Sequence, residues 1–177
     1  MKNFKYILTI LFFTLFSTTA FSQNNIAVLD VVKLLKESKA AISMKDQLNA
    51  VAKKYSDEDQ KKQKEIQKQE EELLRQKATL TPEAFSDRKN AFEKVVIEFN
   101  KDRDKKRKAL AKAEREAVGQ IEEAVEKIVQ AMITSGEITL VIRKSAVILS
   151  KDDIDITSKI VEKLNKEIST IDVKVSP

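Results

Sequence analysis

The spacing of apolar and polar positions predicts helices along the long, charged middle of the chain, and these helices meet at one turn. Thr81 can cap a helix there, because its side-chain oxygen can accept from a free backbone N–H group. Pro82 follows at the first helical position, where a missing N–H and a fixed φ are favourable. Leu80 and Phe85 occupy the two positions of a hydrophobic staple. We therefore predict two helices that fold back on each other at residues 79–82.

The two predicted helices form one arm, which spans residues 39–133 and has its tip at 79–85. Near both ends of the arm, apolar residues recur at spacings of three and four, as in a coiled coil. The apolar-depleted zone 56–64 on the first helix faces the depleted zone 97–105 on the second, the mirror order that an antiparallel pair requires. Gly119, inside the second helix, is interpreted either as a flexing point or as a small residue at a close helix contact.

Before the arm, Ile26–Leu29 is a short apolar run that we interpret as a buried strand. Asp30 follows it and can cap a helix that starts at Val31. Two possibilities stay open at Ser38–Ala40: the helix continues into the arm, or it is interrupted there.

After the arm, Gly136 is the expected C-terminal cap of the second helix. Ile138–Ile142 and Ala146–Leu149 are two strand candidates rich in β-branched residues, and the three-residue link between them predicts a hairpin. Asp155 can cap a last helix that carries apolar residues on one face. The alternating tail, residues 171–175, is either a further short strand or disordered.

Charged residues make up 34% of the 177-residue chain and aromatic residues 6%, which is typical of long helices rather than of a large compact core. The net charge of +5 is too mild for a dedicated nucleic-acid binder, so we expect no nucleic-acid partner. The chain has no Cys and no His, so the usual metal and nucleophile clusters are missing. Asp152, Asp153 and Asp155 are best interpreted as a loop with a helix cap. We expect no enzyme activity and no cofactor.

Residues 1–22 have the pattern of a secretory signal, with two lysines before a short apolar run at Tyr6–Phe16. This run is too short to span a bilayer as a mature helix. The small residues after it predict cleavage after Ser22 or Ala20, and an uncleaved N-terminal anchor is the alternative. We therefore expect an exported protein whose stability does not depend on disulfides.

The segments that flank the arm, 23–38 and 134–177, predict a small β/α body. Its strands are too few and too short for a stable sheet in one chain, so we expect several chains to pool them. The predicted fold is mainly α with a small β base, in which a long antiparallel helical hairpin projects from a β-barrel body formed by oligomerisation. The residues expected to build that body are Ile26, Val28, Ile138, Leu140, Ile142, Val147 and Leu149.

Three segments carry a family resemblance: Ile26-Ala27-Val28-Leu29-Asp30-Val31 after the signal, the apolar strand candidates from Ile138 to Leu149, and Asp155-Ile156-Thr157 followed by Ile160, Val161 and Leu164. Together with the charged hairpin between them, they resemble the Skp/OmpH family of periplasmic chaperones over nearly all of the mature chain. The resemblance implies a periplasmic homotrimer with a β-barrel body. Its helical tentacles would hold unfolded outer-membrane proteins, without ATP, before membrane insertion. Some members of the family bind lipopolysaccharide, but no motif here assigns that site.

Under this resemblance, apolar side chains of the arm become candidate contacts for unfolded client proteins. Phe85, Phe92 and Phe99 recur every seven residues and so lie along one stripe. Packing between the two helices is the alternative interpretation of this stripe. Phe99 favours client contact, because the mirror register places it opposite Lys61 and Lys62, which offer no apolar partner. The candidate contact residues are Phe85, Phe92, Val96, Phe99, Leu73 and Leu74.

A basic run follows the aromatic stripe and comprises Lys101, Arg103, Lys105, Lys106, Arg107 and Lys108. It is interpreted either as a solvated helix surface or as an attraction for acidic clients, anionic lipid or lipopolysaccharide head groups. Two other classes of function stay open beside the chaperone. One is a structural coiled-coil adaptor of the cell envelope, and the other is a peripheral protein that binds anionic lipid or lipopolysaccharide without holding proteins.

Overall fold

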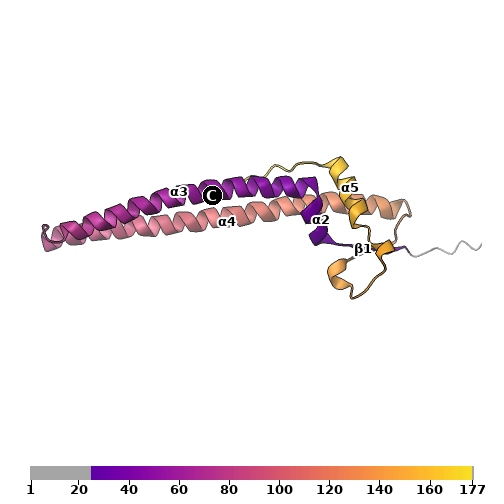
Figure 1. Cartoon of the computed structure of the whole chain (residues 1–177), viewed down its shortest axis with the longest axis horizontal. Helices are drawn as coiled ribbons and strands as arrows, with labels where there is room; N and C mark the ends of the chain where they lie inside the picture. Colours follow the sequence, from indigo (N-terminus) through magenta and orange to yellow (C-terminus); the bar gives the residue numbers. More distant parts are fainter. Residues whose placement is uncertain (1–24, 177) are drawn as a thin grey trace, which may run out of the picture.

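The computed structural model describes residues 25–176 and shows one long arm of two helices with a small base at one end (Figure 1). The predicted signal segment, residues 1–22, lies outside the described residues. The elements, in chain order, are β1 (Ile26–Leu29), α2 (Val31–Glu37), α3 (Lys39–Gln76), α4 (Pro82–Thr134), β2 (Leu140–Arg143), the 3-10 turns η1 (Lys144–Ala146) and η2 (Asp152–Ile154), and α5 (Thr157–Glu167). The chain is therefore mainly helical with a small strand pair.

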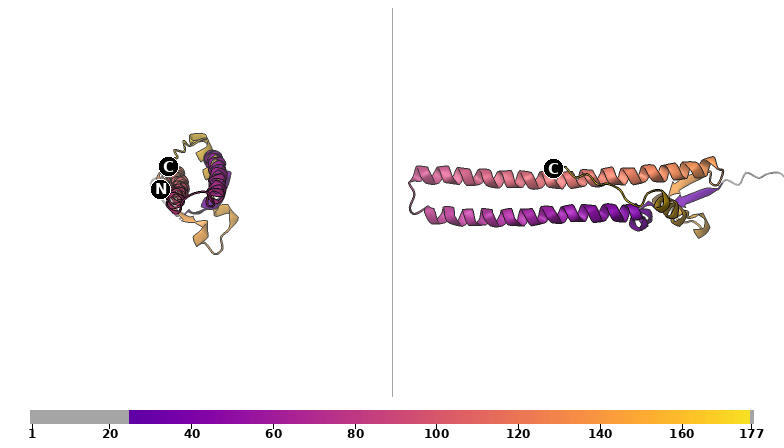
Figure 2. Two further views of the ribbon diagram at one scale, coloured as in Figure 1. Left: turned by 90° about the vertical axis from the view of Figure 1, so that its left-hand side faces the viewer. Right: turned by 90° about the horizontal axis from the view of Figure 1, so that it is seen from above.

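The arm is an antiparallel pair of helices, α3 and α4, which lie side by side from the base to the tip (Figure 2). α3 has 38 residues and α4 has 53. At about 1.5 Å per residue, the helices are about 57 Å and about 80 Å long. α3 ends at Gln76 and α4 begins at Pro82, where the Thr81 hydroxyl oxygen accepts from the backbone N–H of Ala84 at 3.3 Å. The predicted fold-back and its helix cap are thus confirmed.

The arm contains buried side chains at its root, next to the base. In α3 and α4 these are Ala40, Ala41, Met44, Ala109, Ala113, Ala117, Ile121, Ile128 and Met132. Between the two sets, residues 45–108 include no buried side chain. The distal arm therefore buries little apolar surface, and most of the hydrophobic stabilisation lies where the root meets the base.

The base forms around β1, in which Ala27, Val28 and Leu29 are buried and Ile26 is exposed. β1 pairs with β2 in parallel, in the register that places Ile26 opposite Leu140. A parallel connection needs a long crossover, and here the crossover is the whole arm. The Val28 carbonyl also accepts from the backbone N–H of Ile156 at 3.0 Å, which ties the segment before α5 to the same strand. β1 therefore joins the segment before the arm to two segments that follow it.

The structure contradicts the predicted hairpin between Ile138–Ile142 and Ala146–Leu149. β2 takes its partner from β1, and the chain then turns through η1 instead of returning as a strand. The Lys144 ammonium lies 3.0 Å from a carboxylate oxygen of Asp155 and holds this turn against the base. The residues that follow have no strand partner within the described chain, and Leu149 is 91% exposed. A β-branched composition favours a strand, but a strand also needs an available partner.

Ser38 interrupts the first helical segment, which decides between the two possibilities that the sequence leaves open. It is fully buried, and its N–H donates to the carbonyl of Leu34 at 2.9 Å, which closes α2. Its hydroxyl oxygen accepts from the N–H of Ala41 at 3.4 Å, which opens α3. Asp30 caps α2 as predicted, since its carboxylate accepts from the N–H of Lys33 at 2.9 Å. The base and the arm thus meet at a capped joint.

The last helix and the tail pack against the root of the arm. α5 buries one apolar face, as predicted, but its N-cap is Ile156, which makes no side-chain capping bond, so the prediction that Asp155 caps this helix is wrong. The Asp155 carboxylate lies one residue earlier and accepts from the backbone N–H of Thr157 at 2.9 Å. The tail is neither a strand nor detached from the fold: Ile171 is buried in the core, and Val173 packs partly against it. The tail therefore adds contacts to the same joint between base and arm.

Gly119, inside α4, and Gly136, just beyond its end, should respond to alanine substitution with opposite changes in the free energy of unfolding. A Cβ at Gly119 would meet no heavy atom within 4 Å, which contradicts the close-contact interpretation. We expect Gly119→Ala to raise the free energy of unfolding by up to about 1 kcal/mol, because glycine costs about that much inside a helix. Gly136 has a φ of +75° just beyond α4, as expected for its capping role, so Gly136→Ala should lower that free energy by about 1 kcal/mol.

Thermal unfolding followed by circular dichroism, at one fixed protein concentration, compares the two variants with the unchanged protein. Shifts of the same sign in both variants would contradict this assignment of the two glycines.

Candidate functional site

Near its tip, the arm carries a shallow cleft between α3 and α4. The cleft has a volume of about 260 Å³ and is lined by Leu73 and Phe92, which are both half-buried. The Arg88 guanidinium donates to the side-chain oxygen of Gln76 at 2.5 Å and links the two helices beside it. Leu74, in contrast, is 62% exposed. Leu73 and Phe92 are therefore shared between arm packing and the surface, whereas Leu74 is presented to the surroundings.

Phe99 lies farther from the tip, among charged side chains. It lines a second cleft, of about 600 Å³, together with Lys62 from the opposite helix, as the mirror register predicts. The Arg103 guanidinium stands over the Phe99 ring, 5.6 Å from its centre, in a cation–π contact. Phe85 and Val96, the remaining predicted contact residues, are half-buried as well. The aromatic stripe thus forms no closed core, and each ring keeps part of its surface open.

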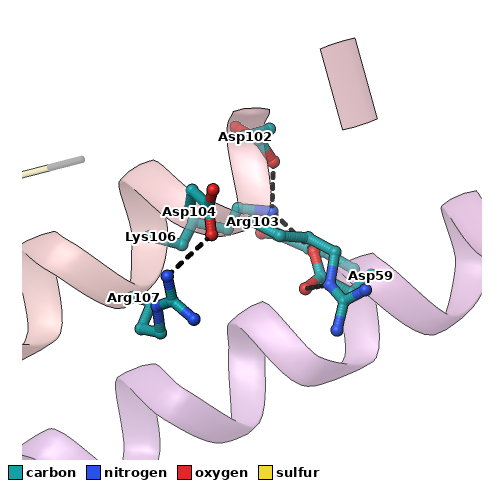
Figure 3. Close-up of polar contacts among 7 residues, drawn as sticks. Asp59, Asp102, Arg103, Asp104, Lys106 and Arg107 are labelled. Carbon is teal, nitrogen blue, oxygen red and sulfur yellow. Dashed lines mark hydrogen bonds and ion pairs between the residues drawn. The ribbon is translucent and has the colours of Figure 1, made fainter. Parts of the chain in front are cut away.

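Lys106 is the centre of a network of ion pairs that joins the two helices midway along the arm (Figure 3). Its side chain is 13% exposed, and its ammonium lies 3.1 Å from Glu58 and 3.1 Å from Asp59 on α3. It also lies 2.8 Å from Asp102 on α4 and 5.4 Å from the centre of the Tyr55 ring. The hydrogen bond to Asp102, with those to Asp59 and Glu58, raises the pKa of Lys106 well above its ordinary value, although burial acts against this. The lysine is therefore a permanent positive charge between carboxylates.

The rest of the basic run is divided between paired and unpaired charges. The pairs are Arg103 with Asp59 (3.5 Å), Arg107 with Asp104 (2.9 Å) and Lys101 with Glu98 (2.9 Å). Within residues 25–176, Lys105 and Lys108 take part in no ion pair, and both are exposed. Neighbouring carboxylates thus partly neutralise four of the six basic side chains, and two keep free charges on the surface.

A larger groove opens along the root of the arm, between α3 and α4. Its volume is about 1700 Å³, and its lining combines apolar side chains such as Ile42, Leu48 and Leu110 with polar ones such as Asn49 and Glu114. The sequence prediction did not include this groove. Ile42, which is 47% exposed, could have been noticed, because it is a large apolar residue that lies off the coiled-coil seam.

The base carries a second exposed apolar surface. The predicted body residues fall into two groups: Val28 and Ile138 belong to the core of this chain, Ile142 and Val147 are half-buried, and Ile26, Leu140 and Leu149 are exposed. Ile148, which was not singled out from its run, is fully exposed beside Leu149. Exposed large apolar side chains that gather at one end of a molecule are typical of an interaction surface.

The carboxyl group of Asp155 should make the stability of the base depend on pH. Hydrogen bonds from Thr157, together with Lys144, lower the pKa of Asp155 from 3.8 to about 2. A carboxyl group whose pKa is lowered by folding stabilises the fold above its unfolded pKa and loses that contribution as pH falls through the folded value. We expect about 2 kcal/mol to be lost between pH 4 and pH 2, since one pKa unit corresponds to about 1.4 kcal/mol.

Chemical unfolding at a series of pH values tests this, with Asp155→Asn as the comparison. The variant should be less stable at pH 7 and should lose less stability between pH 4 and pH 2. Parallel pH profiles for the two proteins would be inconsistent with this role of Asp155.

Within the part of the chain that the structure describes, no helix is long and apolar enough to cross a membrane. Residues 25–176 also contain no group of three or more His, Cys, Asp or Glu side chains arranged to hold a metal ion.

The arrangement defines a class of protein: a long antiparallel helical arm on a small β base, with apolar side chains spaced among charges. The chain belongs to the family described as Outer membrane protein (OmpH-like), which matches residues 25–164, so the resemblance of the terminal segments is confirmed. No curated protein matches the chain.

The chain is also similar to a solved structure from Caulobacter crescentus CB15, determined at 2.83 Å and titled as a candidate OmpH-like outer membrane chaperone. The two share 14% sequence identity, and the match has a TM-score of 0.78 over 86% of this chain and 90% of that chain. The likeness therefore extends over both arm and base and confirms the mainly helical fold.

Proposed function

We propose that this protein is an ATP-independent holding chaperone of the periplasm, which keeps unfolded outer-membrane proteins from aggregating before membrane insertion. The observation that carries the proposal is the distal arm of this OmpH-like chain. Its residues 45–108 contain no buried side chain, yet Leu73, Phe92 and Phe99 are partly open to contact. An arm built in this way offers apolar contact surface without a closed core of its own.

Binding through such an arm is weak at each point and spread over many points. Each half-open apolar side chain contributes a small contact, and the charges between them keep the arm soluble when no client is present. A surface of this kind can accept many sequences, because no single contact is decisive. A client held by many weak contacts can leave without ATP when a tighter folding site competes for it.

We further propose that three chains assemble through their bases into a barrel-like body, so that three arms enclose a cavity. The two-stranded sheet of one chain is below the size that is stable alone, which favours pooling of strands. Exposed Leu140, Ile148 and Leu149 supply apolar surface for that contact. The arms then surround the client, and their length sets the depth of the cavity.

Dilution of a urea-unfolded outer-membrane barrel, followed by light scattering, tests the holding function. The mature protein should suppress aggregation in proportion to its concentration, with no ATP present. Scattering that is the same with and without the protein would contradict the proposal.

Exposed apolar residues of the arm should contribute to client affinity without contributing to stability. Leu74 and Ile97 are 62% and 52% exposed, so partial burial of each against a client contributes about 0.5–1 kcal/mol. We expect Leu74→Ser with Ile97→Ser to weaken client binding by about tenfold and to leave the unfolding temperature unchanged. Fluorescence titration with a labelled unfolded client measures this. Val32→Ser, at an exposed apolar residue of α2, is the control and should bind normally.

A second function is favoured by Lys105 and Lys108, whose exposed charges could contact anionic lipid or lipopolysaccharide head groups. Sedimentation with anionic vesicles tests it. Binding that falls steeply with salt and is lost in Lys105→Gln with Lys108→Gln would support it. Binding to neutral vesicles to the same extent would oppose it.

A further inference from the structure

The tail beyond α5 lies outside the part of the chain that matches the family, which ends at residue 164. It runs from α5 back along the arm in an extended conformation (Figures 1 and 2). The burial of its side chains alternates: Ile171 is 6% exposed, Val173 and Val175 are half-buried, and the residues between and after them, Asp172, Lys174 and Ser176, are exposed. One edge of the tail therefore faces the arm, as one face of a β-strand faces a core.

Gln47, on α3, holds the backbone of this tail with both ends of its side-chain amide. Its Nε2 donates to the carbonyl of Ile171 at 2.5 Å, and its Oε1 accepts from the N–H of Val173 at 3.1 Å. The same Nε2 lies 3.1 Å from the hydroxyl of Ser43, which fixes the orientation of the amide. A residue of a neighbouring parallel strand makes this same pair of bonds, to the carbonyl and the N–H that flank one residue. Gln47 thus acts as a one-residue strand edge on the surface of a helix.

The backbone hydrogen bonds from Gln47 and the alternating apolar contacts together would recognise a residue pattern and not one particular sequence. The two bonds from Gln47 go to backbone atoms, which every segment has except where proline intervenes, and the apolar contacts require only that every second side chain be apolar. Alternation of apolar and polar residues over about ten positions is the signature of strands in outer-membrane barrels. Strand-like docking of an extended segment is also a recurrent mode of peptide recognition.

We propose that the face of the arm around Gln47, just beyond the root, is a binding site for one extended, alternating apolar–polar segment of an unfolded barrel protein, and that the tail is its built-in occupant. The inference rests on the proposed holding function, because it identifies the segments that this function would recognise. A tethered tail competes at an effective concentration in the millimolar range. A client segment must displace it, so binding at this site stays weak until many segments of one client engage the arms.

Binding of a fluorescent peptide that copies residues 168–177 tests the proposal in the full-length mature protein. Val173→Pro removes the N–H that Gln47 holds and leaves both Gln47 and Ile171 in place. This variant should bind the peptide at least threefold more tightly than the unchanged protein, which corresponds to a tail that is docked in about two thirds of the molecules. Lys174→Pro is the matched control, since the exposed Lys174 is next to the clamp, and it should bind like the unchanged protein.

Two further comparisons make the test independent of any change in folding. Adding Gln47→Ala to Val173→Pro should remove the gained binding, whereas adding Gln67→Ala, at an exposed position of the same helix, should not. A peptide of the same composition with its apolar residues grouped together should bind at least threefold more weakly. Equal binding of the two peptides, or equal binding by Val173→Pro and Lys174→Pro, would overturn the proposal.

The outcomes also separate this site from the holding function. If the protein suppresses client aggregation but Val173→Pro gains no peptide binding, the site is wrong and the chaperone function stands. If the gain is seen and aggregation is unaffected, the site is real, and the proposed holding function is wrong.

Discussion

Replacement of Ile148 and Leu149 together by aspartate should convert the assembled protein into folded monomers. Both side chains are almost fully exposed in the single chain, so the change costs little within one subunit. In a pooled body they become buried between subunits, where an unpaired carboxylate costs several kcal/mol. The mass measured by light scattering should fall to one third, while the helical circular dichroism signal stays the same.

Val32→Asp is the control for this experiment, because Val32 is 78% exposed on α2 and is not part of the proposed contact. It should leave the mass unchanged. A double variant that keeps the full mass, or an unchanged protein that is already monomeric, would contradict the proposed barrel-like body.

Removal of the Lys106 side chain should loosen the middle of the arm more than any other change in the basic run. Lys106→Ala leaves Asp59 and Asp102 facing each other without the cation that lies between them. Because the Asp59 and Asp102 carboxylates are 23% and 53% exposed and stay partly hydrated, we expect a loss of about 1–2 kcal/mol, less than the roughly 3–5 kcal/mol that breaking a fully buried pair costs. Chemical unfolding gives the free energy, and hydrogen exchange of α3 and α4 shows where the loosening occurs.

Lys105→Ala separates this effect from a general loss of positive charge. Lys105 is next in the sequence, is exposed and makes no ion pair within residues 25–176, so its removal should change stability by less than about 0.5 kcal/mol. Equal effects of the two substitutions would show that the network does not hold the arm together.

The parts of the fold that are encoded locally could be predicted from the sequence. Thr81 and Pro82 fix the start of α4, and Asp30 fixes the start of α2, because a capping bond involves residues only three apart. The charged middle predicts an antiparallel arm, since its apolar and polar zones follow one another in mirror order. The terminal segments also carry the family resemblance, which the match over residues 25–164 confirms.

Three features that the sequence did not reveal depend on partners far away in the chain. Ala146–Leu149 has strand composition, but β1 is already paired with β2, so the run stays a loop. Lys106 is indistinguishable in sequence from Lys105, yet the twist of α4 turns the first toward Asp59 and the second toward the surroundings. The docking of the tail depends on Gln47, more than a hundred residues earlier, whose side chain carries no signal of this role.

For the candidate contact residues too, the sequence predicts what is encoded locally and not what depends on distant partners. The seven-residue spacing correctly places Phe92 and Phe99 along the arm, where both line clefts between the helices. Their degree of exposure could not be predicted, because it depends on how closely α3 and α4 approach at each level. Whether these side chains touch clients stays a prediction.

The arm is divided into a well-packed root and a sparsely packed distal part, and the two parts suit different roles. The root joins β1, α5 and the tail into one core, and this fixes the direction of the arm. Beyond it, ion pairs and half-buried apolar side chains hold the two helices together without a closed interior. Under the proposed function, such an arm would adjust its surface to different clients while the base holds the subunits together.

The composition of the complex with a client shows whether assembled arms enclose an unfolded protein. A urea-unfolded outer-membrane barrel is diluted into the mature protein, and the mass of the soluble complex is measured by light scattering coupled to size exclusion. We predict one trimer bound to one unfolded client. A client that aggregates with no soluble complex, or that binds only to single chains, would contradict the claim that assembled arms enclose it.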